Sequence, residues 1–190
     1  MGELNKVWDE TEAWKNMSQY LGWVRGQLRK SWSDYPVRKN FKSETLLLIS
    51  QAQKDSGDFH PSTKKVGMCV MCEEFMAGSK LEVDHITPSD GCKTKEEAES
   101  FLWYCMNPLK GDMQLVCKPC HKVKTYSERM NTSFDEAVLA KKAIAFSKLP
   151  INKQKEYLLL HSVEEKSMMN AKARKGAYLV VLKKGVCDEL

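Results

Sequence analysis

Apolar side chains near the start of the chain recur at steps of three and four residues. Such spacing places them on one face of a helix, and it predicts an amphipathic helix from about Glu10 to Lys30. The apolar stripe consists of Trp14, Met17, Leu21, Val24 and Leu28.

The pattern is interrupted over residues 31–38, where Pro36 disfavours helical geometry at the residue before it. A second helix is predicted near Ser43 to Lys54. The Gly-, Pro- and Ser-containing stretch from Asp55 to Lys65 is typical of a linker.

Helix start signals are frequent in the second half of the chain. Thr94-Lys95-Glu96-Glu97 is a capping-box pattern, which predicts a helix to about Met106 that Asn107-Pro108 ends. Further helices are predicted from Lys118 through Arg129, from the Ser133 capping box to about Lys148, and from Pro150 to about His161.

The C-terminal part has two segments that periodicity does not assign. The run Ala177 to Leu182 is apolar and lies between two glycines, so it fits either a helix or a strand. The basic tract 170–176 before it fits a charged turn or an arm that binds nucleic acid.

Charge divides the 190 residues into three regions that we take as domains. Residues 1–65 hold 11 Lys and Arg against 8 Asp and Glu, residues 66–132 hold 8 against 10, and residues 133–190 hold 11 against 7. An acidic centre between helical basic arms suits a polyanionic partner such as DNA. Solvated helices can carry the same lysines, so both interpretations stay open.

The composition is that of a soluble protein, with 42% hydrophobic and 29% charged residues. No apolar run approaches the roughly 18 residues of a membrane span, and no signal peptide is evident. We therefore expect a cytoplasmic protein without a membrane partner.

Four of the seven cysteines form two Cys-x-x-Cys pairs, which are Cys69 with Cys72 and Cys117 with Cys120. A two-residue gap lets both sulfurs of a pair reach one ion, so the four predict a closed, structural Zn²⁺ site rather than disulfides. Cys92, Cys105 and Cys187 are then free thiols.

Asp84 and His85 lie between the two cysteine pairs, and His121 follows the second pair. These residue types bind a catalytic cation and activate water. At the end of a strand, neighbouring side chains point to opposite faces, so Asp84 can hold a cation while His85 faces the water. Alternatively, Asp84 and His85 are a structural pair, or His121 replaces one cysteine on the zinc.

Polar side chains follow His121 on the predicted helix. Lys124 and Thr125 lie three and four residues further, nearly on the same face, and are candidates for phosphate contact. Lys122 and Arg129 are further candidates, and all of these side chains fit a solvated helix face as well.

Taken together, these motifs resemble the zinc-containing HNH endonucleases, the ββα-metal family. The resemblance covers about Cys69 to Arg129 and includes Val83-Asp84-His85-Ile86 and Gln114-Leu115-Val116-Cys117. It implies an α+β fold, with a mainly helical chain around a small treble-clef-like core that zinc holds together. It also implies His85 as general base, Asp84 and His121 as ligands of a catalytic cation such as Mg²⁺, Mn²⁺ or Ni²⁺, and hydrolysis that leaves a 5′ phosphate.

One position departs from the family pattern. The usual asparagine, which braces the loop that carries the base, is replaced by Asp112. An aspartate accepts the same hydrogen bonds but lacks the amide donor. Asn107 is an alternative brace.

Features outside the core resemble HNH proteins of phages. A helix is inserted between His85 and Cys117, and Leu28-Arg29, Trp32 and Pro36-Val37-Arg38 resemble an upstream cluster of such proteins. This resemblance implies a phage or prophage origin, packaging or replication proteins as partners, and contact of Arg29 and Arg38 with DNA.

The leading hypothesis is a metal-dependent HNH endonuclease acting on DNA. The alternatives are a zinc-stabilised nucleic-acid-binding or assembly module with little catalysis, and an RNase.

Overall fold

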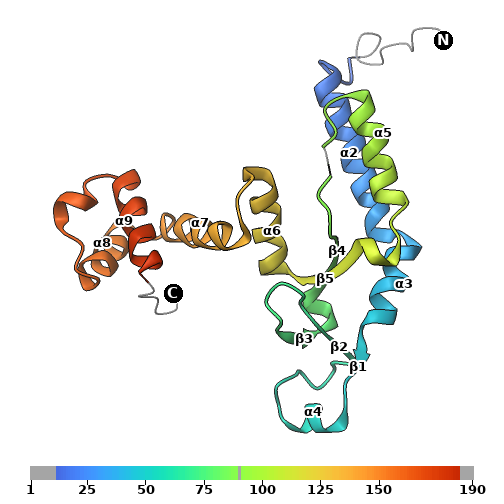
Figure 1. Ribbon diagram of the computed structural model, residues 1–190, viewed down its shortest axis with the longest axis horizontal. Helices are drawn as coiled ribbons and strands as arrows, with labels where there is room; N and C mark the ends of the chain where they lie inside the picture. Colours follow the sequence, from blue (N-terminus) through green and yellow to red (C-terminus); the bar gives the residue numbers. More distant parts are fainter. Residues whose placement is uncertain (1–11, 90, 185–190) are drawn as a thin grey trace. The chain divides into compact units, whose positions relative to one another are not determined.

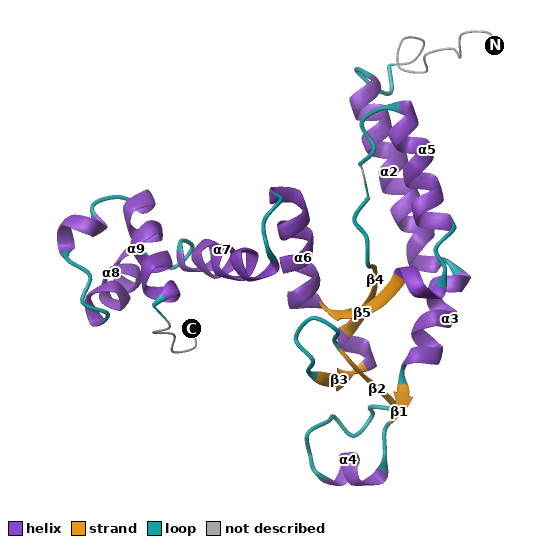
Figure 2. Cartoon of the chain, in the orientation of Figure 1, coloured by secondary structure: helices purple, strands orange, loops and turns teal. Residues whose placement is uncertain are grey.

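The computed structural model describes residues 12–89 and 91–184. The chain forms two compact units: unit 1 extends to His121, and unit 2 begins at Lys122. Helices combined with two small antiparallel sheets make this an α+β protein (Figures 1 and 2). Within the described ranges, no helix has both the length and the apolar character needed to cross a membrane. The three regions predicted from charge stay a prediction.

Within the described residues of unit 1, the first helices are α2 (Met17–Asp34) and α3 (Pro36–Thr45). The side chain of Asn16 caps α2 by accepting a hydrogen bond from the backbone of Gln19 at 3.0 Å. The predicted start at Glu10 lies outside the described residues, and α2 continues to Asp34 rather than ending at Lys30. The predicted break is confined to Tyr35, which is extended because Pro36 follows it.

The predicted helix from Ser43 to Lys54 is wrong. This segment contains the end of α3, strand β1 (Leu47–Leu48) and a short helix α4 (Gln51–Asp55). Strand β1 pairs with β2 (Lys65–Met68), which also pairs with β3 (Phe75–Ala77). The two leucines are extended because of this pairing with a partner far along the chain, which local periodicity does not reveal.

The second sheet of unit 1 consists of β4 (Leu81–His85) and β5 (Met113–Cys117), paired antiparallel with His85 opposite Met113. Helix α5 (Lys95–Met106) lies between them in the sequence, as predicted, and packs against α2. Helix α6 (Lys118–Met130) begins directly after β5, which confirms its predicted start. The chain therefore forms two paired strands followed by a helix.

The cap of α5 has a measurable role. The Thr94 hydroxyl accepts a hydrogen bond from the backbone of Glu97 at 3.2 Å. Thr94→Ala should lower the free energy of unfolding by about 0.5–2 kcal/mol, because a backbone N–H loses its acceptor. Urea unfolding followed by circular dichroism measures this change. Ser100→Ala removes an exposed hydroxyl within the same helix and should have little effect; equal losses in both variants would contradict the capping role.

Unit 2 contains α7 (Phe134–Phe146), α8 (Ile151–Leu160) and α9 (Ala171–Lys183). The predicted starts of α7 and α8 are confirmed, including the Ser133 capping box. The Ala177–Leu182 run is helical and belongs to α9. The core gathers around stacked rings of Phe146 and Tyr178, whose centroids are 4.1 Å apart.

The basic tract 170–176 is not a charged turn, because α9 begins at Ala171. The Asn170 side chain caps this helix by accepting from the backbone of Ala173 at 2.9 Å. Arg174 is buried and donates hydrogen bonds to the Gln154 side chain and to the Met168 carbonyl. At least this arginine therefore belongs to the core of unit 2 and not to an arm.

Candidate functional site

The first cysteine pair lies in a tight turn directly after β2. The backbone N–H of Glu73 donates to the Cys69 carbonyl at 2.8 Å, and Glu73 has a positive φ of 58°. The Cys69 N–H donates to the Glu74 carbonyl at 3.0 Å, which closes the turn. These bonds bring the sulfur atoms of Cys69 and Cys72 to the same side.

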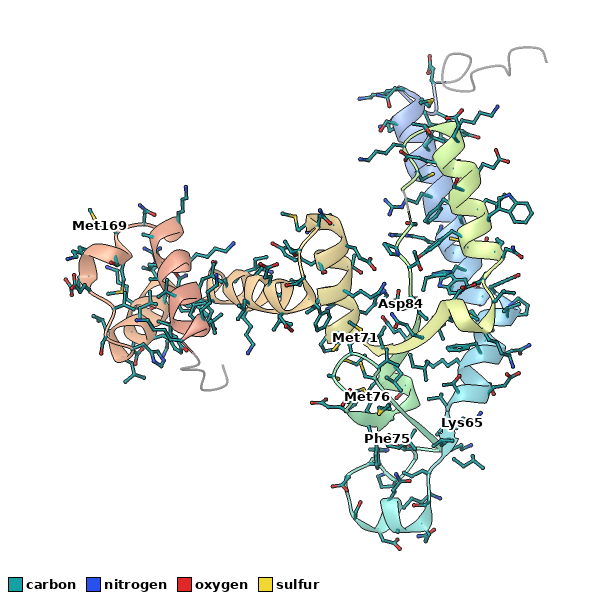
Figure 3. All side chains as sticks on the ribbon, viewed as in Figure 1. Lys65, Met71, Phe75, Met76, Asp84 and Met169 are labelled. Atoms are coloured by element: carbon teal, nitrogen blue, oxygen red, sulfur yellow. The ribbon has the colours of Figure 1, made fainter. Side chains whose placement is uncertain are left out.

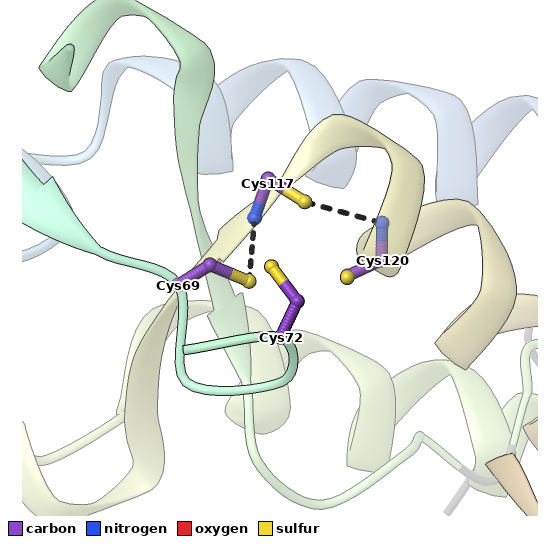
Figure 4. Close-up of side chains that lie close together, drawn as sticks. All are labelled: Cys69, Cys72, Cys117 and Cys120. Atoms are coloured by element: carbon purple, nitrogen blue, oxygen red, sulfur yellow. Dashed lines mark hydrogen bonds between the residues drawn. The ribbon is translucent and has the colours of Figure 1, made fainter. Parts of the chain in front are cut away.

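The second pair comes from the junction of β5 and α6. Cys117 is the last residue of β5 and Cys120 lies in the first turn of α6. All four sulfur atoms lie within 4.8 Å of one another (Figure 4). Tetrahedral Zn–S bonds of about 2.3 Å would set neighbouring sulfurs roughly 3.8 Å apart. The four cysteines are therefore arranged as they would be to hold one metal ion.

Backbone N–H groups point at the sulfurs and favour thiolates. The Cys117 N–H donates to Sγ of Cys69 at 3.2 Å, and the Cys120 N–H donates to Sγ of Cys117 at 3.4 Å. Burial raises the pKa of Cys69, but backbone donors, that of Cys117 foremost, outweigh burial and lower the pKa to about 7. Burial raises the pKa of Cys120. Metal binding would then release protons from such thiols.

The other two cysteines within the described residues lie apart from this cluster. Cys92 and Cys105 are free thiols, as predicted, and the structure places both in the buried packing between α2 and α5. Cys187 lies outside the described residues.

Side chains alternate along strand β4, and this places the predicted base and the predicted cation ligand on opposite faces of the strand. Leu81, Val83 and His85 are buried, whereas Glu82 and Asp84 are only half-buried. This alternation follows from the two-residue period of a strand. By this pattern Asp84 shares a face with Glu82, and His85 points to the other face. Figure 3 labels Asp84.

His121 lies between the two carboxylates. Its Nδ1 is 2.7 Å from Glu82 Oε2, and its Nε2 is 3.3 Å from Asp84 Oδ1. The hydrogen bond to Asp84, followed by that to Glu82, raises the pKa of His121 to about 9, although burial acts in the opposite direction. The imidazole is therefore protonated at neutral pH and donates to both carboxylates.

Glu82, Asp84 and His121 form a second group of side chains whose donor atoms suit a divalent cation, because carboxylate oxygens and imidazole nitrogens both bind Mn²⁺, Ni²⁺ and Zn²⁺. Gln114 donates to the other oxygen of Asp84 at 3.1 Å and orients the carboxylate. Among the described residues, only the four cysteines bring three or more ligand atoms within 4.8 Å of one another. In the group formed by Glu82, Asp84 and His121, the two nitrogens of the imidazole each contact one carboxylate instead.

Sequence reasoning missed Glu82 and Gln114. Glu82 could have been found from the alternating order Glu-Val-Asp, because residues two apart share a strand face. Gln114 could not, because its place beside Asp84 depends on the register in which β4 and β5 pair.

The His85 ring is held between two aromatic rings. Trp32 of α2 stacks on it with centroids 4.3 Å apart, and Tyr104 of α5 stacks on it at 4.0 Å. The Tyr104 hydroxyl donates to the Thr87 carbonyl at 2.9 Å, which ties α5 to the chain just after β4. The aromatic clamp, Trp32 and Tyr104, fixes the plane of the imidazole and leaves His85 only 7% exposed.

His85 opens on a small pocket of about 130 Å³. Its lining includes Asn107 and Asp112, the two residues considered as the brace, and the exposed ring of Trp103. The Asp112 carbonyl accepts from the backbone of Ile86 at 2.9 Å, and its carboxylate accepts from the backbone of Leu109 at 2.8 Å. Asp112 therefore contacts the loop after His85 through its main chain, and its side chain closes the preceding turn.

The two arginines predicted to contact DNA differ in their surroundings. Arg29 is exposed on α2. Arg38 donates to the Ser33 carbonyl at 2.9 Å and lies over the Trp32 ring, 5.8 Å from its centroid. Their contact with DNA stays a prediction.

The candidates beyond His121 belong to unit 2. Lys124 forms an ion pair with Glu128, which offsets its charge. Arg129 lies over the Tyr126 ring at 5.5 Å, and Lys122 and Thr125 are exposed. Phosphate contact by these four stays a prediction.

Comparisons of the chain with protein-family models, with curated proteins and with solved structures found no match.

Proposed function

We propose that the protein is a metal-dependent HNH endonuclease that hydrolyses DNA phosphodiester bonds. The observation that carries this proposal is the order β4, β5, α6, in which His121 meets Asp84 across 3.3 Å while His85 lies on the opposite face of the same strand. The four clustered cysteines, two from the turn after β2 and two from the junction of β5 and α6, support it, because they would hold a structural Zn²⁺ beside these residues.

Each residue has a separate role in this proposal. His85 accepts the proton of the attacking water as general base, and the aromatic clamp orients its ring. Asp84 and His121, with Glu82, would hold a divalent cation. The bound cation would stabilise negative charge on the phosphate and on the departing oxygen. Because His121 is protonated when it bridges the two carboxylates, cation binding would displace a proton.

A plasmid-nicking assay tests the proposal. Supercoiled plasmid is incubated with the purified protein and Mg²⁺, Mn²⁺, Ni²⁺ or Zn²⁺ in turn, and nicked and linear forms are resolved on a gel. We expect cleavage with at least one added cation and none without. Asp84→Asn keeps the shape of the side chain but removes its charge, so this variant should require a higher cation concentration for cleavage. Absence of cleavage with every cation would overturn the proposal.

One observation favours a second candidate, a zinc-stabilised nucleic-acid-binding module with little catalysis. His85 is 7% exposed within the aromatic clamp, and such burial also suits a structural residue. A pure binding module would retard the plasmid without producing nicked or linear forms. Labelled RNA and DNA digested side by side would separate an RNase from a DNase.

A further inference from the structure

A large open groove lies in unit 1, and its lining includes none of the proposed zinc ligands, cation ligands or general base. It has a volume of about 780 Å³ and is bordered by β3, by the loop between α4 and β2, and by residues 78–80 before β4. Figure 3 labels Lys65, Phe75 and Met76, which line it. Its volume is within the range of pockets that hold ligands.

The charge of the groove is positive. Four lysines line it, against a single carboxylate, that of Asp58. The lysines are Lys42, Lys64, Lys65 and Lys80. Within the described part of the chain, Lys64 and Lys80 are exposed and neither side chain forms an ion pair. Their ammonium groups are therefore available to an anionic ligand.

The other two lysines are already bound to main-chain oxygens. Lys42 donates to the Leu81 carbonyl at 2.6 Å, and Lys65 donates to the Ser43 carbonyl at 2.9 Å. Burial, followed by the charge of Arg38, lowers the pKa of Lys42. Lys42 and Lys65 therefore stabilise the wall of the groove through these hydrogen bonds. Lys64 and Lys80 are the lysines that can contact a phosphate.

Aromatic side chains accompany this charge. Phe75, on β3, is 43% exposed although it is a large apolar residue, and Phe59 lines the same groove. An exposed aromatic ring near lysines is the combination that binds unpaired nucleotides, because a base stacks on the ring while ammonium groups contact the phosphates. In duplex DNA the base faces are already stacked, so these rings would contribute little.

We infer that this groove binds a single-stranded segment of nucleic acid, with a base on Phe75 and phosphates on Lys64 and Lys80. The inference rests on the proposed function, since it makes the groove a second contact for the same substrate. Lys80 directly precedes β4, and Asp84 lies four residue steps further along the strand, roughly 13 Å away. An unpaired stretch of a few nucleotides could therefore extend from the groove toward the cleavage site.

Fluorescence anisotropy tests this inference. A labelled oligothymidylate of about ten nucleotides and a hairpin duplex of the same length are titrated with the full-length protein without added divalent cation, so that no cleavage occurs. The wild type should bind the single strand more tightly than the duplex. Phe75→Leu keeps an apolar side chain but removes the aromatic face, and it should weaken single-strand binding about tenfold. Phe75→Tyr should retain binding.

The lysines are tested through salt dependence. The double variant Lys64→Gln, Lys80→Gln should make the negative slope of log affinity against log salt shallower by about 1.4. Each phosphate contact to a single strand contributes about 0.7 to the steepness of this slope. Lys148→Gln with Lys172→Gln removes two exposed charges from unit 2 and is the matched control. Circular dichroism and zinc content check the fold of every variant.

Several outcomes would overturn the inference. These are equal or tighter binding of the duplex, unchanged binding by Phe75→Leu, or equal loss of slope in the two lysine pairs. If the wild type nicks plasmid and the groove variants bind the single strand normally, the proposed nuclease function stands and the role of the groove is refuted. If the protein binds single strands preferentially through the groove but never nicks plasmid, single-strand binding by the groove is supported and the proposed nuclease function is refuted.

Discussion

Replacing His85 with phenylalanine is expected to reduce DNA cleavage by about 10²- to 10⁴-fold without unfolding the protein. The phenyl ring keeps the stacking with Trp32 and Tyr104, at 4.3 and 4.0 Å in the wild type, but it has no nitrogen to accept a proton. His85→Ala should lose a similar amount of activity and also some stability, because it leaves a cavity within the aromatic clamp.

The two variants together separate chemistry from packing. Initial rates of plasmid nicking are measured with the most effective cation, and thermal unfolding is measured on the same preparations. His161→Ala removes an imidazole from unit 2, where it lies against Tyr157, and should cleave at the wild-type rate. Added imidazole should partly restore His85→Ala but not His85→Phe. A His85→Phe protein as active as the wild type would refute the role of His85 as base.

Removing the metal proposed for the four-cysteine cluster should unfold the centre of unit 1 and leave the helices of unit 2 formed. Structural Zn²⁺ contributes roughly 10–16 kcal/mol in small zinc-binding peptides, which is comparable to the whole stability of a typical domain, about 5–15 kcal/mol. Cys69 and Cys117 belong to the same hydrophobic cluster as β4 and β5, so loss of the ion also exposes that core. The described residues of unit 2 contain no cysteine and have a separate core.

Elemental analysis and circular dichroism measure this effect. We expect about one Zn²⁺ per chain, and a chelator should remove the tertiary signal of unit 1 while part of the helical signal persists. Cys72→Ala should lose the metal. Cys105→Ala removes a buried thiol outside the cluster and is the control that should keep it. A protein that contains no zinc and still folds would show that the cysteines are ordinary thiols.

The cysteine cluster and the starts of α5, α6, α7 and α8 could be predicted from the sequence. The two-residue gaps of the cysteine pairs, the Thr94 and Ser133 caps and the proline at position 150 act over three or four residues, and such local constraints hold in nearly any tertiary context. The assignment of Asp84 and His85 to opposite faces also follows from a local rule, the two-residue period of a strand.

Contacts between distant segments were decided only by the tertiary structure. Leu47 and Leu48 form a strand because β2 pairs with them, although their sequence surroundings favour a helix. Trp32 and Tyr104 enclose His85 because α2 and α5 pack together. Gln114 meets Asp84 through strand register, and Glu82 meets His121 because α6 follows β5 directly. Sequence by itself determined which chemical groups are present and their local geometry, whereas the free energy of non-local packing determined which of them face one another.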